Sequence, residues 1–167
     1  SGVIHRGVYY APGSLKARLC ADGAERLVAY CDDRGIPVLR CGKVVVAADA
    51  AELPRLEELE RRARANGVPG LRAIGPEELR ELEPHAAGVR ALHSPSTWTV
   101  DFARVAAAFA DDLRAAGGEL LLGREVAGLR RRGRETVLLT SQGPVAARHV
   151  VACAGVYADR LAALSGA

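Results

Sequence analysis

The feature of this sequence that most constrains its fold is the run HVVACAG at residues 149–155. A buried strand is typical of the apolar part of this run. The small residues and the glycine at its end allow a ligand or a helix to approach the backbone closely. Ligands of open α/β sheets bind at the carboxyl ends of strands, where Ala154 and Gly155 would lie. The run therefore predicts a buried strand that ends at a ligand site, or else at an ordinary strand–helix joint.

Hydrophobic periodicity assigns helices and strands to the rest of the chain. A helical period covers residues 14–33, 52–66, 76–83, 101–116 and 156–165. Alternating or β-branched runs predict strands over residues 38–47, 89–93, 120–122, 126–130, 136–140 and 145–152. The predicted fold class is α/β, with mixed α+β character in a charged middle third. A segment inserted into a nucleotide-binding layer would produce this pattern, and so would two unrelated small domains.

Charge and hydropathy exclude several classes of partner. The net charge is +3 and aromatic residues make up only 4% of the chain, which argues against nucleic acid. The dense basic run 130–134 is typical of a solvated hairpin, with a polyanion site as the alternative. Because no stretch approaches about 20 apolar residues, we expect no membrane-spanning segment.

The cysteines indicate neither a metal site nor a disulfide framework. Cys20, Cys31, Cys41 and Cys153 form no CxxC pair and have no histidines at ligand spacing. This usage is typical of a reducing compartment, so we expect a cytoplasmic protein, with peripheral attachment to the inner membrane face as an alternative. The sequence contains no methionine, which predicts a processed chain or an internal piece of a longer one.

The first 17 residues form a loop rich in positioning residues ahead of a helix. This loop, SGVIHRGVYYAPGSLKA, contains three glycines, a proline and several hydrogen-bonding side chains. Loops of this composition often carry function. His5 lies within it, and a lone histidine is by spacing alone more often structural than catalytic.

Together the opening loop and the HVVACAG run resemble the D-amino-acid-oxidase-like superfamily of FAD-dependent oxidoreductases. Within it the chain is similar to L-2-hydroxyglutarate oxidases and dehydrogenases. The resemblance covers nearly the whole chain, including the segments CGKVVVA, LHSPSTxxVDF and GGELLLGREV. Two departures are visible. The GxGxxG turn of the family is missing, which implies an internal fragment that is inactive alone, and Trp98-Thr99 stands where a small and an aliphatic residue are expected.

The resemblance implies a partial Rossmann-like FAD-binding layer with a segment of a β-sheet substrate domain. Residues 1–35 and 101–167 would belong to the FAD-binding domain and residues 36–100 to the substrate-binding domain. The residues implied to contact FAD are Ser1, Gly2, Val126, Cys153, Ala154 and Gly155.

The implied reaction is oxidation of a small 2-hydroxy acid, similar to L-2-hydroxyglutarate, to the 2-oxo acid by hydride transfer to flavin N5. A neutral histidine titrates near working pH, so His5 is the expected base. Candidates for binding the carboxylate substrate are Tyr10, Lys16 and Thr97, with Arg6 and Tyr9 as further cationic or hydroxyl groups. Oxygen or a quinone would accept the electrons. The alternatives are oxidation of an amine or glycerol phosphate, or a non-catalytic α/β binding module.

Overall fold

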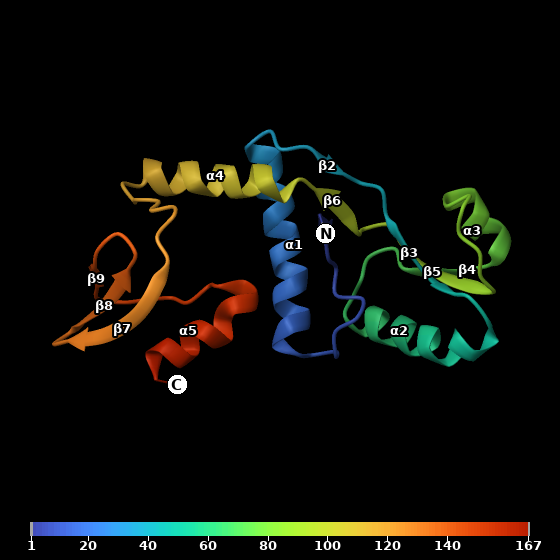
Figure 1. Ribbon diagram of the computed structural model, residues 1–167. Helices are drawn as coiled ribbons and strands as arrows, with labels where there is room; N and C mark the ends of the chain where they lie inside the picture. The colour runs from blue at the N-terminus through green and yellow to red at the C-terminus, as the bar shows by residue number, and fades with distance from the viewer. Residues whose placement is uncertain (1, 167) are drawn as a thin grey trace. The chain divides into compact units, whose positions relative to one another are not determined.

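The computed structural model describes residues 2–166 and divides into two compact units, Ser1–Asp112 and Leu113–Ala167. Helices and small antiparallel sheets make up both units, which confirms the mixed α/β class (Figure 1). The units divide the chain at a different place from the predicted domain boundaries. The assignment of residues 1–35 and 101–167 to a cofactor domain therefore stays a prediction.

The first sheet of the larger unit is built from three short segments that lie far apart in the sequence. Strand β6 (Trp98–Val100) lies in its centre and pairs antiparallel with β1 (Val3–Ile4) and β2 (Val38–Leu39). Helix α1 (Leu15–Asp33) follows β1, with Ser14 as its N-cap. Helix α4 (Phe102–Ala115) follows β6 directly.

A hydrophobic core joins this sheet to α1 and to the start of α4. Its buried members are Ile4, Ala24, Val28, Cys31, Ile36, Val100 and Val105. Polar contacts also join α1 to α4. The Tyr30 hydroxyl donates to Asp112 at 2.6 Å, and Arg34 pairs with the same carboxylate at 2.5 Å. The Tyr30 ring also packs on Phe109, 4.8 Å between ring centres. In Figure 1 the start of α4 accordingly lies at the end of α1.

The second sheet belongs to the same unit and has the order β3–β5–β4. The elements of this region are β3 (Lys43–Ala47), the short helix η1 (Ala50–Glu52), α2 (Leu53–Ala65), β4 (Arg72–Ile74), α3 (Pro76–Leu82) and β5 (Arg90–Ser94). Helix α2 packs on this sheet through a core made of Val8, Ala47, Leu56, Ala63, Val68, Leu71 and Leu92. Since Val8 belongs to this core, the opening loop is anchored to α2 as well as to α1.

The smaller unit is a three-stranded meander followed by a helix. It consists of β7 (Val126–Arg132), β8 (Glu135–Thr140), β9 (Val145–Ala147), the short helix η2 (Gly155–Tyr157) and α5 (Ala158–Ser165). The turn between β7 and β8 contains Gly133 at φ +61°, a conformation that glycine adopts without steric cost. The basic run flanks this turn and is exposed, which confirms the predicted solvated hairpin. Within residues 2–166, no helix is both long and apolar enough to cross a bilayer.

Two strand predictions were wrong. Residues 120–122 form no strand, and the predicted strand 145–152 ends at Ala147, where its pairing with β8 ends. A strand needs a neighbour that satisfies its backbone groups, and no described segment pairs with residues 148–152. Conversely, β6 was missed, because three residues after a turn are too short to show a period.

The packing of β5 predicts that truncating two leucines lowers the free energy of unfolding by unequal amounts. Leu92 is 1% exposed in the core under α2, whereas Leu19 on α1 is 59% exposed. Replacing Leu92 by Ala in the complete protein is expected to lower the free energy of unfolding by about 2–5 kcal/mol, because a cavity replaces a packed side chain. Urea unfolding measures the loss, and Leu19→Ala is the control expected to stay near wild type. Equal midpoints for the two variants would contradict the assigned core.

Candidate functional site

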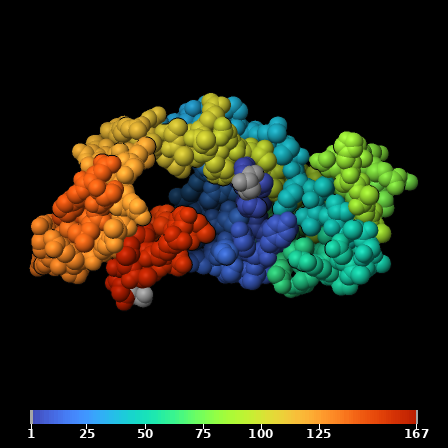
Figure 2. Space-filling model, in the orientation of Figure 1, coloured from blue at the N-terminus to red at the C-terminus, as the bar shows by residue number. Residues whose placement is uncertain are grey.

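The β1–β6–β2 sheet has one covered and one open face. Directly paired residues of an antiparallel sheet share a face, and the faces alternate along each strand. Ile4 pairs with Trp98, and both pack on the α1 side. Val3 pairs with Thr99, so these two lie on the opposite face. Figure 2 shows the dark-blue start of the chain at the surface against the yellow β6 segment.

His5 follows Ile4 directly after the end of β1, and it is exposed. Cys41, which follows β2, reaches Thr99 on the open face, with 4.0 Å between Sγ and Oγ1. The open face thus carries small polar and apolar groups, and the exposed imidazole of His5 comes directly after the strand at one edge of the sheet.

Trp98 points away from this open face. The guanidinium groups of Arg6 and Arg40 lie over its ring, 5.3 and 4.6 Å from the ring centre. Each of these arginines also pairs with a carboxylate of α1, Arg6 with Glu25 at 3.7 Å and Arg40 with Asp32 at 3.9 Å. The departure from the family pattern at Trp98 is therefore accommodated on the α1 side, and Arg6 is engaged there.

Lys43, at the start of β3, lies next to the loop that carries His5. Its ammonium group donates to the Tyr9 hydroxyl at 3.3 Å and lies 4.4 Å from the centre of the Tyr9 ring. On the other side of the loop, the Cys20 thiol of α1 donates to the backbone carbonyl of His5 at 3.3 Å. His5, Tyr9, Cys20 and Lys43 therefore form one cluster, which we call the His5 cluster.

The environment of His5 favours its neutral form. Partial desolvation lowers the pKa of the imidazole, and the positive charge of Lys43 lowers it further. A histidine with a pKa below its ordinary value of 6.5 is unprotonated at neutral pH and can accept a proton. The His5 cluster can therefore supply a base and a cation side by side.

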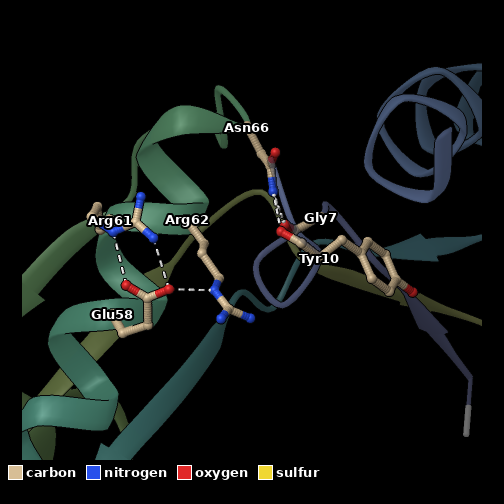
Figure 3. A network of polar contacts seen from close by, with 6 residues as sticks. All are labelled: Gly7, Tyr10, Glu58, Arg61, Arg62 and Asn66. Carbon is tan, nitrogen blue, oxygen red and sulfur yellow. Dashed lines mark hydrogen bonds and ion pairs between the residues drawn. The ribbon is translucent and has the colours of Figure 1, made fainter. Parts of the chain in front are cut away.

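Asn66, at the C-terminal end of α2, holds the opening loop in place. Its side-chain amide donates to the carbonyl of Gly7 at 2.8 Å and to that of Tyr10 at 2.9 Å. Figure 3 shows both bonds, with the loop lying against the end of the helix. Gly7 has a φ of +86°, a conformation that disfavours side chains with a Cβ. The amide of Asn66 thus bridges the two sides of a tight turn.

A separate ion-pair network lies further along α2. Glu58 accepts from Arg61 and from Arg62, at 2.8 and 2.7 Å (Figure 3). The hydrogen bonds from these two guanidinium groups lower the pKa of Glu58 to about 2. The side chains of Glu58, Arg61 and Arg62 pair with one another on the surface of α2 and do not belong to the His5 cluster.

The three predicted substrate-binding residues lie in different surroundings. Thr97 is buried, and its hydroxyl lies 2.9 Å from that of Ser94 inside the turn before β6. Lys16 is exposed in the first turn of α1, 5.7 Å from the centre of the Tyr10 ring. These contacts favour a turn-forming role for Thr97, while Tyr10 and Lys16 lie at the surface beside the opening loop.

In the smaller unit, three of the predicted FAD-contacting residues line one pocket of about 880 Å³. Val126 of β7 lies on one wall, and Cys153 and Ala154 lie on another. Gly155, next to this wall, has a φ of +57° and no atom near the position of a Cβ. The volume is in the range of small-molecule sites, and the exposed backbone allows close approach of a ligand. These residues are therefore suited to hold part of a large cofactor.

The other two predicted FAD contacts belong to the larger unit. Gly2 has a φ of +72°, and its carbonyl accepts from the Val100 amide at 2.8 Å. Ser1 lies outside the described residues. A Cβ at Gly2 would lie 3.4 Å from the Val100 carbonyl, so a side chain there would be strained by its backbone conformation.

Sequence reasoning missed two residues of the site, Lys43 and Asn66. A signal for Lys43 was present: the chain has 23 basic residues, and only Lys16 and Lys43 among them are lysines. Both lie over adjacent tyrosines of the opening loop. Nothing in the sequence pointed to Asn66, because an asparagine before a glycine is typical of any helix end.

Comparison with known proteins gives one family over the full length. The sequence model of the family described as FAD dependent oxidoreductase (DAO) matches residues 1–167. The chain is 41% identical over 180 residues to a mitochondrial L-2-hydroxyglutarate dehydrogenase of Nematostella vectensis, covering 99% of this chain and 40% of the relative. It is 42% identical over 178 residues to the mitochondrial L-2-hydroxyglutarate dehydrogenase of Homo sapiens, covering 99% and 38%.

Solved structures agree with this result. A glycine oxidase from Geobacillus kaustophilus superposes with a TM-score of 0.87 at 26% identity, over 99% of this chain and 47% of that one. An L-α-glycerophosphate oxidase from Mycoplasma pneumoniae with FAD bound gives 0.85 at 25% identity, over 98% and 45%. The chain spans about two fifths of the length of the curated relatives that it matches.

The two bonds from Asn66 predict that this side chain orders the opening loop. Replacing Asn66 by Asp in the complete protein removes both N–H donors, and each lost bond is worth about 0.5–1.5 kcal/mol. We expect faster amide hydrogen exchange in the peptide covering residues 5–13, measured by mass spectrometry. Glu58→Gln on the same helix is the control, because it disrupts only the surface ion pairs. Unchanged exchange in Asn66→Asp would show that other contacts hold the loop.

Proposed function

We propose, from the premise that this chain belongs to the FAD-dependent oxidoreductase (DAO) family, that the protein oxidises a small 2-hydroxy acid similar to L-2-hydroxyglutarate to the 2-oxo acid. The observation that carries this proposal is the sequence identity of 41–42% to proteins named L-2-hydroxyglutarate dehydrogenases, which extends over 99% of the chain. The His5 cluster supports it chemically, because oxidation of an alcohol needs a group that accepts the hydroxyl proton.

His5 acts in this reaction as the proton acceptor. Its imidazole is exposed directly after β1, and its lowered pKa favours the neutral form. The hydroxyl proton of the substrate moves to this imidazole as the hydrogen on the adjacent carbon leaves as hydride. The product is the 2-oxo acid, and the proton is released from His5 to solvent.

FAD, when bound, supplies the acceptor for this hydride at its N5 atom. The residues predicted to contact it are Ser1, Gly2, Val126, Cys153, Ala154 and Gly155. The pocket shared by three of these residues and the open backbone at Gly155 support the assignment. The final electron acceptor, oxygen or a quinone, stays a prediction, as does the cytoplasmic location.

A second candidate function is oxidation of an amine or of glycerol phosphate. It is favoured by the structural similarity to a glycine oxidase and an L-α-glycerophosphate oxidase. The identity to these proteins is 25–26%, well below that to the L-2-hydroxyglutarate dehydrogenases, so 2-hydroxy acids are the first substrates to test.

The pocket in the smaller unit predicts a dependence of FAD content on Ala154. A leucine there would project into the space that the cofactor needs. We expect Ala154→Leu in the complete protein to contain at least several-fold less FAD after purification, measured from the visible spectrum against protein concentration. Ala127→Leu on the exposed side of β7 is the matched control. Full flavin content in Ala154→Leu would place the cofactor elsewhere.

Reduction of the bound flavin tests the function and the role of His5 together. The complete protein is mixed anaerobically with L-2-hydroxyglutarate, glycine or glycerol 3-phosphate in a stopped-flow instrument, and the flavin absorbance is followed. We expect rapid bleaching with L-2-hydroxyglutarate alone. A positioned base contributes about 10²–10⁴-fold, so His5→Ala should slow this step by that factor, equivalent to about 3–5 kcal/mol.

His85→Ala is the control for this variant, because His85 is exposed in the turn before β5. Bleaching by glycine or glycerol 3-phosphate in place of the hydroxy acid would favour the second candidate function. If His5→Ala retains its flavin and reduces it within a few-fold of wild type, His5 is not the base.

A further inference from the structure

We propose that Lys43 binds the carboxylate next to the reacting hydroxyl group, and that Tyr9 holds the ammonium group in position for it. This inference rests on the proposed function and adds a residue that determines its specificity for 2-hydroxy acids. It starts from the geometry of the His5 cluster, in which Lys43 donates to Tyr9 at 3.3 Å and lies over its ring at 4.4 Å.

Lys43 differs from Arg6 and Arg40 in having no carboxylate partner, and from Lys16 in being half-buried rather than exposed. Arg6 and Arg40 are paired with acidic residues of α1 and stacked on Trp98. Among the described residues, no carboxylate forms an ion pair with Lys43, and its ammonium group contacts the hydroxyl and the ring of the neutral Tyr9 side chain. The side chain is nevertheless half-buried. This ammonium group can therefore form a charge-assisted hydrogen bond with a substrate carboxylate, the stronger class of hydrogen bond.

The position of Lys43 identifies which carboxylate it binds. The residue follows Cys41 by two positions, and Cys41 contacts Thr99 on the open face. Lys43 also contacts Tyr9 of the loop that carries His5, and its positive charge is one of the causes that lower the pKa of His5. When His5 takes the proton of the C2 hydroxyl, the C1 carboxylate is the group one bond away, and the distal carboxylate of a five-carbon diacid lies further from this cation.

A lysine suits this position better than an arginine. A compact ammonium on a flexible chain can contact both the Tyr9 hydroxyl and a substrate oxygen, whereas a guanidinium is broader and prefers a planar two-point contact. The chain uses arginine at 21 of its 23 basic positions and retains lysine at Lys43. Two consequences follow: removal of the charge should weaken binding of every 2-hydroxy acid, and an arginine should restore the charge but only part of the affinity.

The test uses the complete flavin-loaded protein with Lys43→Gln, Lys43→Arg and Tyr9→Phe. Arg26→Gln on the exposed surface of α1 is the charge-matched control. Two substrates are compared, L-2-hydroxyglutarate and L-2-hydroxybutyrate, which lacks the distal carboxylate. We expect Lys43→Gln to raise KM at least tenfold for both, Lys43→Arg to raise it less, and Tyr9→Phe to raise it about two- to fivefold. Calorimetric titration with 2-oxoglutarate, which needs no turnover, should show the same order of affinities.

The pH profile separates this role from a structural one. Among the described residues, the titratable groups around His5 are Lys43 from β3, Cys20 from α1 and Tyr9 from the loop, and Lys43 is the positive charge that lowers the pKa of His5. Loss of this charge removes a cause that lowers the pKa of His5, so the acid limb of kcat/KM should move to higher pH in Lys43→Gln. It should stay in place in Lys43→Arg.

Each outcome is decisive for one of the two proposals. A KM within twofold of wild type in Lys43→Gln for both substrates, with unchanged titration by 2-oxoglutarate, overturns the role of Lys43. A loss confined to L-2-hydroxyglutarate overturns the assignment to the C1 carboxylate. If wild type reduces its flavin with neither hydroxy acid, the proposed function fails. The calorimetric comparison of wild type, Lys43→Gln and Arg26→Gln then still decides whether Lys43 binds carboxylates.

Discussion

The pairing of β6 with β1 and β2 is the constraint on which the larger unit depends. β6 has only three residues, and it satisfies the backbone groups of two segments that are far away in the sequence. Its alternating side chains then separate two environments. Trp98 and Val100 pack toward α1 with Ile4 and Val38, whereas Thr99 points to the open face. A shift of register by one residue would exchange these faces.

The covered face is held by charges as well as by apolar contacts. Arg6 and Arg40 enclose the ring of Trp98 and pair with carboxylates of α1, and the Tyr30–Asp112 bond joins α1 to α4. The charged and polar groups of these residues are therefore engaged in contacts within the fold. Lys43 contacts a neutral phenol, and no carboxylate among the described residues pairs with it, so its charge is not neutralised in the described part of the fold.

The opening loop links this sheet to the second one. Val8 is buried in the core under α2, and Asn66 fastens the carbonyls of Gly7 and Tyr10. His5 lies between these anchors and β1, so its position is determined from both sides. A base must lie within hydrogen-bond reach of the proton that it accepts, and a loop fixed at both ends meets this requirement more easily than a free one.

The sequence alone determined the helices, the position of the basic hairpin and the family, because each depends on local periodicity or on long motifs. It also pointed to His5 and residues 153–155 as candidates, through motifs that the family shares, and their roles stay predictions. Only the tertiary structure decided that β6 exists, that residues 148–152 have no strand partner in the described chain, and that Asn66 and Lys43 adjoin the opening loop. The physical reason is that sheet pairing and ion-pair partners join residues that are distant along the chain. Whether a lysine is neutralised depends on which side chain the fold brings beside it, and no local pattern contains that information.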